Sequence, residues 1–175
     1  VLIKNDGVLP LDPAKGSYAV VGAGATDAFS LMGNYYGTSE RMVSYLEGIT
    51  SAVDAGTDVA YRPTFLYGDT NHVSFVPGSD VVIAVVGLTG AFEGEEGDAI
   101  ASARNGDRDT IDLPPEQMRF LEKAQERRKK GGKIVAVVTG GSPVALKKVE
   151  ALADAVVVAW YAGEEGGNAL ADLLF

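Results

Sequence analysis

Carboxylates are concentrated in one segment of the 175-residue chain, between Leu88 and Leu113. The segment has no helical or strand periodicity, and it carries seven acids and two bases: Glu93, Glu95, Glu96, Asp98, Asp107, Asp109, Asp112, Arg104 and Arg108. Loops of this length in compact domains are usually functional or disordered. Carboxylates crowded after a buried strand have reason to titrate abnormally, which is what acid/base catalysis requires. This segment is therefore the first candidate for chemistry.

The densest group of acids is the tetrapeptide Glu93–Glu96, with glycine at its second position. Three carboxylates within four residues repel one another, which predicts that at least one carboxyl has a raised pKa. Such a carboxyl can hold a proton near neutral pH and donate it to a leaving oxygen. Gly94 and Gly97 allow the backbone to bend close to a ligand. The alternative interpretation is a solvated acidic loop that binds nothing.

Other motifs carry weaker indications. The segment Gly22–Asp27 is glycine-rich, but an aspartate stands where a dinucleotide fingerprint has glycine or alanine, so a tight turn is favoured over a nucleotide cradle. His72 is the only histidine, and no serine elbow exists to pair with it. The spacing of an EF-hand is missing from Asp107, Asp109 and Asp112. We therefore predict neither a metal site nor a cofactor.

Composition limits the classes of partner. A net charge of −9 and a pI of about 4.6 argue against nucleic acid, because phosphate binding needs a basic face. The chain has no cysteine, which excludes disulfides and thiolate sites. No apolar run reaches the roughly 18 residues of a membrane span, so no membrane partner is predicted. The cellular compartment stays open.

Strand and helix patterns alternate along the chain. Short apolar runs predict strands over residues 17–22, 58–61, 80–87, 133–139 and 155–161. Amphipathic patterns predict helices over residues 41–55, 114–130, 142–153 and 164–175. This alternation predicts an α/β fold, a three-layer α/β/α sandwich around a mostly parallel, flavodoxin-like doubly wound sheet of about five or six strands. Ligands gather beyond the carboxyl ends of such strands, where the acidic loop and residues 22–26, 140–142 and 162–166 are expected.

Six motifs, in order along the whole chain, resemble segments of glycoside hydrolase family 3. They are Val1–Leu11, Gly33–Gly37, Glu93–Glu96, Gly106–Pro114, Gly140–Val144 and Trp160–Asp172. The resemblance implies that residues 17–175 form the second, α/β-sandwich domain of such an enzyme. Residues 1–16 would be the linker from an N-terminal (β/α)8 barrel. The family's chain normally extends further on both sides, so we expect this one to be cut at both ends.

The resemblance also implies a function. Family members are retaining, exo-acting β-glycosidases, among them β-xylosidases and β-glucosidases, and their substrates are β-linked xylosides or glucosides. The nucleophile is an aspartate on the barrel, which this chain lacks, so the isolated chain is expected to be inactive. The general acid/base in many members is a glutamate on the second domain's long loop.

Matching that loop to this chain makes Glu95 the general acid/base. Glu96 stands where those members often have glycine, so Glu96 and Glu93 remain alternates. Four further residues are expected to bind substrate or order the loop: Asp107, Arg108, Tyr35 and Tyr36. For the first two, charge-assisted hydrogen bonds that hold the loop are favoured over contacts with sugar.

A different class of function is a non-catalytic α/β module that binds sugar or associates with itself. Without its barrel, the domain would expose the apolar surface that the barrel covers, which favours a homo-oligomer.

Overall fold

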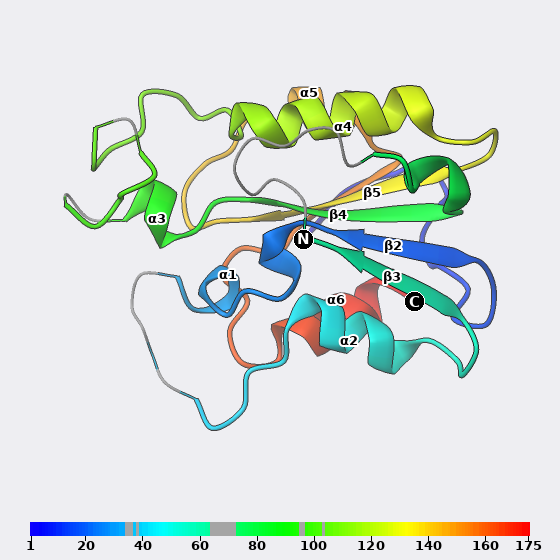
Figure 1. Cartoon of the computed structure of the whole chain (residues 1–175). Coiled ribbons are helices and arrows are strands. Elements are labelled where there is room, and N and C mark those ends of the chain that lie inside the picture. Colours follow the sequence, from blue (N-terminus) through cyan, green and yellow to red (C-terminus); the bar gives the residue numbers. More distant parts are fainter. Residues whose placement is uncertain (34–36, 38, 64–72, 95–96, 103) are drawn as a thin grey trace.

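A computed structural model describes residues 1–33, 37, 39–63, 73–94, 97–102 and 104–175. These residues form one six-stranded sheet with helices on both faces (Figure 1). The strands are β1 (Leu2–Asn5), β2 (Ser17–Val21), β3 (Asp58–Arg62), β4 (Val81–Gly87), β5 (Lys133–Thr139) and β6 (Ala155–Val158). Their order across the sheet is β1-β6-β5-β4-β2-β3.

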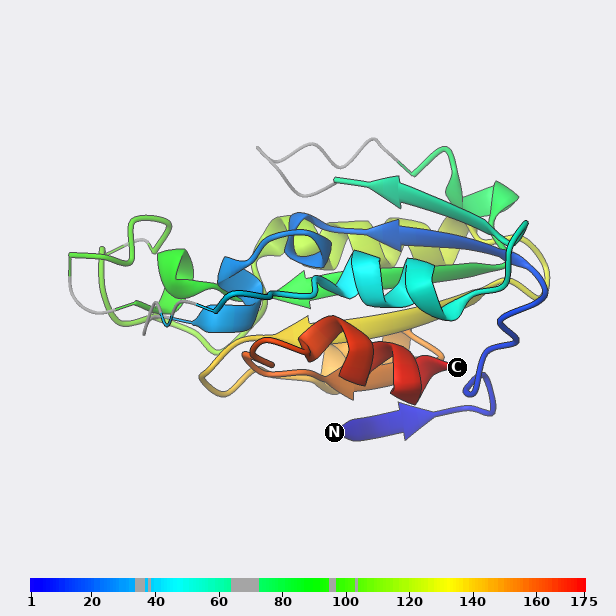
Figure 2. The ribbon, with the colours of Figure 1, turned by 90° about the horizontal axis from the view of Figure 1, so that it is seen from below.

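The five strands from β2 to β6 are parallel, and β1 pairs antiparallel with β6 at one edge (Figure 2). Without β1, this is the strand order of flavodoxin-like doubly wound sheets. The predicted fold class is confirmed.

The central strands are buried on both faces, which explains their continuous runs of valine and alanine. All seven residues of β4 are buried, and successive side chains alternate between two apolar clusters. Ala84 and Val86 of β4 belong to the first cluster, whereas Ile83 and Val85 belong to the second. Two separate cores, one on each side of the sheet, therefore hold the helical layers in place.

Helices α4 (Pro115–Arg127) and α5 (Lys147–Leu152) cover one face of the sheet (Figure 1). Helices α2 (Tyr45–Ala52) and α6 (Gly166–Leu174) pack against each other on the opposite face. The short elements are η1 (Ala23–Ala25), α1 (Phe29–Met32), η3 (Val76–Gly78) and α3 (Gly90–Glu93). Of these, α1 and α3 lie at the end of the sheet where the parallel strands finish (Figure 1).

Two helices begin four or five residues later than their patterns predict. Helix α2 starts at Tyr45, not Arg41, because Ser44 forms a capping box with Glu47. Helix α5 starts at Lys147, not at Ser142, whose amide and hydroxyl both donate to the Glu93 carboxylate. A tertiary contact thus takes the residue at which the predicted helix would begin.

Two sheet features also differ from the pattern. Residues 2–5, inside the segment expected to be a linker, form β1, although no strand was predicted there. Its apolar run is confined to Val1–Ile3, and Leu2 and Ile3 stay exposed at the sheet edge, unlike the residues of the buried strands. Strand β6 ends at Val158, and Trp160 has a positive φ of 59°, which turns the chain out of the sheet. In the described parts of the chain, no helix has the length and apolar character needed to cross a membrane.

Candidate functional site

The acidic loop leaves the sheet at Gly87, the last residue of β4. Here β4 and β5 lie so close that the Leu88 amide donates to Thr139 O at 3.0 Å. The side chain of Gln117 holds the Gly87 peptide on both sides, accepting from its amide at 2.8 Å and donating to its carbonyl at 2.9 Å. The loop therefore starts from a fixed point at the carboxyl rim of the sheet, as expected (Figure 1).

Helix α3 then presents Glu93 to the turn after β5. The Glu93 Oε2 atom accepts from the Ser142 amide at 3.2 Å and from the Ser142 hydroxyl. Its Oε1 atom accepts from the Gly141 amide and from the Tyr161 hydroxyl. Four donors thus surround one carboxylate, and carboxylates take such charge-assisted bonds strongly.

Arg108 brings the far end of the loop to the same turn. Its Nη2 donates to Ser142 Oγ at 2.8 Å and to Pro143 O at 2.6 Å. Ser142 is therefore shared, because its hydroxyl donates to Glu93 and accepts from Arg108. Asp107 is exposed and makes no hydrogen bond or ion pair with any described residue. We call Glu93, Arg108, Gly141, Ser142 and Tyr161 the Ser142 cluster.

Tyr161 joins this cluster to a further segment of the chain. A Cβ added to Gly141 would lie 2.7 Å from the Tyr161 ring, and one added to Gly33 would lie 2.6 Å from it. The ring therefore packs directly on two glycine backbones. Burial is the main cause that raises the pKa of Tyr161 far above its usual value, and the bonded Glu93 carboxylate raises it further. Tyr161 stays a neutral hydrogen-bond donor throughout the physiological range.

The predicted catalytic and tyrosine residues are only partly covered by the structure. Glu95, Glu96, Tyr35 and Tyr36 lie outside the described residues, as does His72. The residues that flank the glutamate pair are described: the Gly94 amide donates to Gly90 O and the Gly97 amide to Asn105 O, both at 2.7 Å. The pair Glu95 and Glu96 is thus bounded in sequence by two residues with fixed backbone partners.

The sequence predicted no individual role in the functional site for Ser142, Gly141 or Tyr161. Gly141 and Ser142 follow one predicted strand and Tyr161 ends another, which predicts a place at the carboxyl rim, and all three lie within motifs of the family 3 resemblance. The motifs that begin at Gly33, Glu93, Gly140 and Trp160 are distant in sequence and contact one another around Tyr161. Only the tertiary structure shows that these motifs lie in contact with one another.

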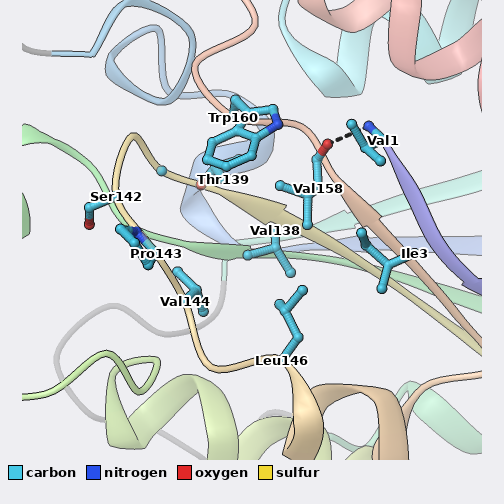
Figure 3. Close-up of a pocket in the computed structure, with 11 residues that line it drawn as sticks. Val1, Ile3, Val138, Thr139, Ser142, Pro143, Val144, Leu146, Val158 and Trp160 are labelled. Atoms are coloured by element: carbon cyan, nitrogen blue, oxygen red, sulfur yellow. Dashed lines mark hydrogen bonds between the residues drawn. The ribbon is translucent and has the colours of Figure 1, made fainter.

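An apolar pocket of about 280 Å³ lies beside the cluster, between β1, β6 and the turn after β5 (Figure 3). Its wall includes Val1, Ile3, Pro143 and Trp160. The pocket offers contact area and few polar groups, so it lacks acid/base chemistry of its own. Among the described residues, no group of three or more acids or histidines could hold a metal ion.

A family model described as "Glycosyl hydrolase family 3 C-terminal domain" matches residues 1–175. The chain belongs to this family. A xylan 1,4-beta-xylosidase of Xylanibacter ruminicola is 37% identical over 119 residues, which cover 67% of the chain and 13% of that relative. A periplasmic beta-glucosidase of Salmonella typhimurium is 32% identical over 204 residues, covering 100% of the chain and 25% of that relative.

Solved structures of family 3 proteins agree with the described fold. The Bifidobacterium adolescentis GH3 beta-glucosidase superposes with a TM-score of 0.78 at 29% identity, covering 100% of this chain and 25% of that one. A GH3 exo-beta-xylosidase in complex with a xylobiose aziridine probe gives a TM-score of 0.78 at 28% identity, covering 98% and 22%. The family 3 domain described here thus spans about a quarter or less of the length of these relatives.

Proposed function

We propose that this family 3 domain supplies the general acid/base to a retaining, exo-acting β-glycosidase that cleaves β-linked xylosides or glucosides. The observation that carries the proposal is that two residues of the acidic loop, Glu93 and Arg108, both bind Ser142 in the turn after β5. A loop held at both ends can present a carboxyl beyond the rim of the sheet in a reproducible place. Preorganisation of that kind is what general acid catalysis requires.

Glu95 is the best candidate for the acid. Glu93 has donors on both carboxylate oxygens, so it has little capacity left to protonate a leaving group. Glu95 is separated from it by Gly94 alone. Glu96 stays the second choice because it adjoins Glu95 on the same short segment.

The remaining chemistry would come from a barrel domain outside this chain. An aspartate there would attack the anomeric carbon and form a glycosyl-enzyme while Glu95 protonates the departing oxygen. Glu95, now ionised, would deprotonate the water that releases the sugar with retained configuration. Retention places the two carboxyl groups about 5–5.5 Å apart, so the loop must reach across a domain boundary.

The test compares Glu95→Gln and Glu95→Ala with the parent in the full-length enzyme that carries this chain. We expect hydrolysis of unactivated xylosides or glucosides to fall by about 10²–10⁴-fold, the usual contribution of a general acid. Azide should restore turnover of an activated aryl glycoside by Glu95→Ala and yield a β-glycosyl azide. Parental activity in Glu95→Gln would refute the assignment, and Glu96→Gln run in parallel would identify the alternate.

The isolated 175-residue chain should not hydrolyse these substrates, because it would contain one of the two carboxyl groups. The non-catalytic alternative draws on a specific observation, the exposure of Ile3 (44%) and Trp160 (49%) beside the apolar pocket (Figure 3). Exposed apolar patches commonly mark interaction sites. Light scattering and a xylobiose titration of the chain separate self-association and sugar binding from catalysis.

A further inference from the structure

We infer that Glu93 is a positioning residue, which fixes the loop two residues before the proposed general acid by binding the turn after β5 and the Tyr161 hydroxyl. The inference deepens the proposed function and rests on it. Glu93 does not touch substrate in this scheme. Its effect passes through the loop to Glu95.

The first support is the environment of the Glu93 carboxylate. An ionised carboxylate only accepts hydrogen bonds, and four hydrogen bonds from described residues reach it here, from two amides and two hydroxyls. Glu93 is part-buried, so removing this charge would leave several of those donors unpaired. Three of these four hydrogen bonds are part-buried, and a donor that loses its acceptor away from water costs free energy, which makes the contact resistant to local opening.

The second support is the short connection between Glu93 and Glu95. Two Cα–Cα steps separate them, so their Cα atoms can be no more than about 7 Å apart. Helix α3 stiffens the backbone before Glu95. The Glu93 amide donates to Thr89 O at 3.2 Å, and the Gly94 amide donates to Gly90 O at 2.7 Å. A displacement of Glu93 by one ångström therefore moves the attachment point of Glu95 by a similar amount.

The third support is that Ser142 serves both ends of the loop. Its hydroxyl accepts from Arg108 at 2.8 Å while it donates to Glu93. The orientation of this one hydroxyl is thus set by two charged partners. Loss of the Glu93 carboxylate frees the hydroxyl and weakens the hold on Arg108 as well.

Glutamine cannot replace Glu93 in this position. Its amide nitrogen is a donor and would face the donors of either Gly141 or Ser142, so one side of the contact becomes repulsive. Misplacement of a catalytic group by about 1 Å costs on the order of 100-fold in rate. We expect Glu93→Gln to lower kcat on unactivated glycosides by about 100-fold with KM little changed.

Leaving-group dependence separates positioning from general damage. A dinitrophenyl glycoside needs little proton donation, so its kcat/KM should fall far less than that of xylobiose or cellobiose. A variant that merely lost folded protein would lose both activities equally. Azide should not rescue Glu93→Gln, because Glu95 still occupies the site that azide would need.

The experiment uses the full-length enzyme with four variants: Glu93→Gln, Ser142→Ala, Tyr161→Phe and the control Asp98→Asn. Asp98 lies on the same loop and is exposed, with no side-chain contact to a described residue, so its variant matches the charge change and should keep parental kinetics. Tyr161→Phe retains the ring between Gly33 and Gly141 and removes only the hydroxyl, so it tests the cluster even if Glu93→Gln folds poorly. Both hydroxyl variants should show a smaller loss with the same leaving-group dependence.

A second readout is independent of catalysis. Amide exchange of the peptide that contains residues 140–143 should accelerate in Glu93→Gln and stay unchanged in Asp98→Asn, because Gly141 and Ser142 donate their amides to Glu93. The inference is overturned if all three cluster variants slow activated and unactivated substrates equally, or if Glu93→Gln leaves both kinetics and exchange at parental values. A fully active Glu95→Gln would instead overturn the proposed function while leaving the exchange result intact.

Discussion

Replacing Gly87 with alanine should destabilise the domain more than any other loop glycine substitution we consider. A Cβ at Gly87 would lie 2.2 Å from Thr139 O and 2.5 Å from Thr139 N, which are backbone atoms of the neighbouring strand. The residue also has a φ of 131°, a conformation that L side chains rarely adopt. The peptide cannot rotate away, because Gln117 bonds both its amide and its carbonyl.

The magnitude follows from two costs. An L residue at positive φ costs about 1–2 kcal/mol, and overpacking a fixed core costs about 1–3 kcal/mol, so a total loss of about 2–5 kcal/mol is expected. With a urea slope of about 2 kcal/mol per molar, the unfolding midpoint should fall by about 1–2.5 M. Circular dichroism across a urea series measures that midpoint directly.

Alanine substitutions at two other glycines separate the conformational cost from the cost of overpacking. Gly56 has a φ of 95° and no atom within 4 Å of an added Cβ, so Gly56→Ala should show the conformational cost alone. Gly78 has open space and an ordinary φ, so Gly78→Ala should be neutral or slightly stabilising. If Gly87→Ala loses no more stability than Gly56→Ala, the argument from the close approach of β4 and β5 is refuted.

Three further outcomes are expected. Ser44→Ala removes the acceptor for the Glu47 amide at 3.2 Å and should lower the unfolding free energy by about 1 kcal/mol, whereas an unchanged urea midpoint would contradict the capping box. Asp154→Asn weakens a 2.6 Å pair with Arg128 and should cost about 1.5–3 kcal/mol in the same assay, with no loss expected if the pair is solvated. Tyr161 has a raised folded pKa, so its contribution to stability is complete below about pH 10 and is lost as the pH rises through the folded value. The midpoint temperature of thermal unfolding should therefore fall less steeply with pH in Tyr161→Phe than in the wild type above about pH 10. Equal slopes would show that Tyr161 does not contribute to the pH dependence of stability.

The sequence alone determined the layered α/β fold. Valine-rich runs such as β4 and β5 are typical of strands buried on both faces, and their alternation with amphipathic helices predicts parallel connections. The same logic placed the acidic loop at the carboxyl rim, because that loop follows β4 directly. Motif order along the chain was enough to indicate glycoside hydrolase family 3, and the family match confirms it.

Only the tertiary structure decided what local pattern leaves open. Ser142 and Pro143 resemble the start of a helix, yet the Glu93 carboxylate takes the Ser142 amide and hydroxyl, and α5 begins at Lys147. Residues 2–5 form a strand because β6 offers a free edge, not because their own sequence demands one. No short stretch of sequence predicts that Glu93, Arg108 and Tyr161 meet at the turn after β5. Hydrophobic periodicity is a short-range signal, whereas hydrogen bonds between side chains far apart in sequence exist only once the sheet has brought its loops to one edge.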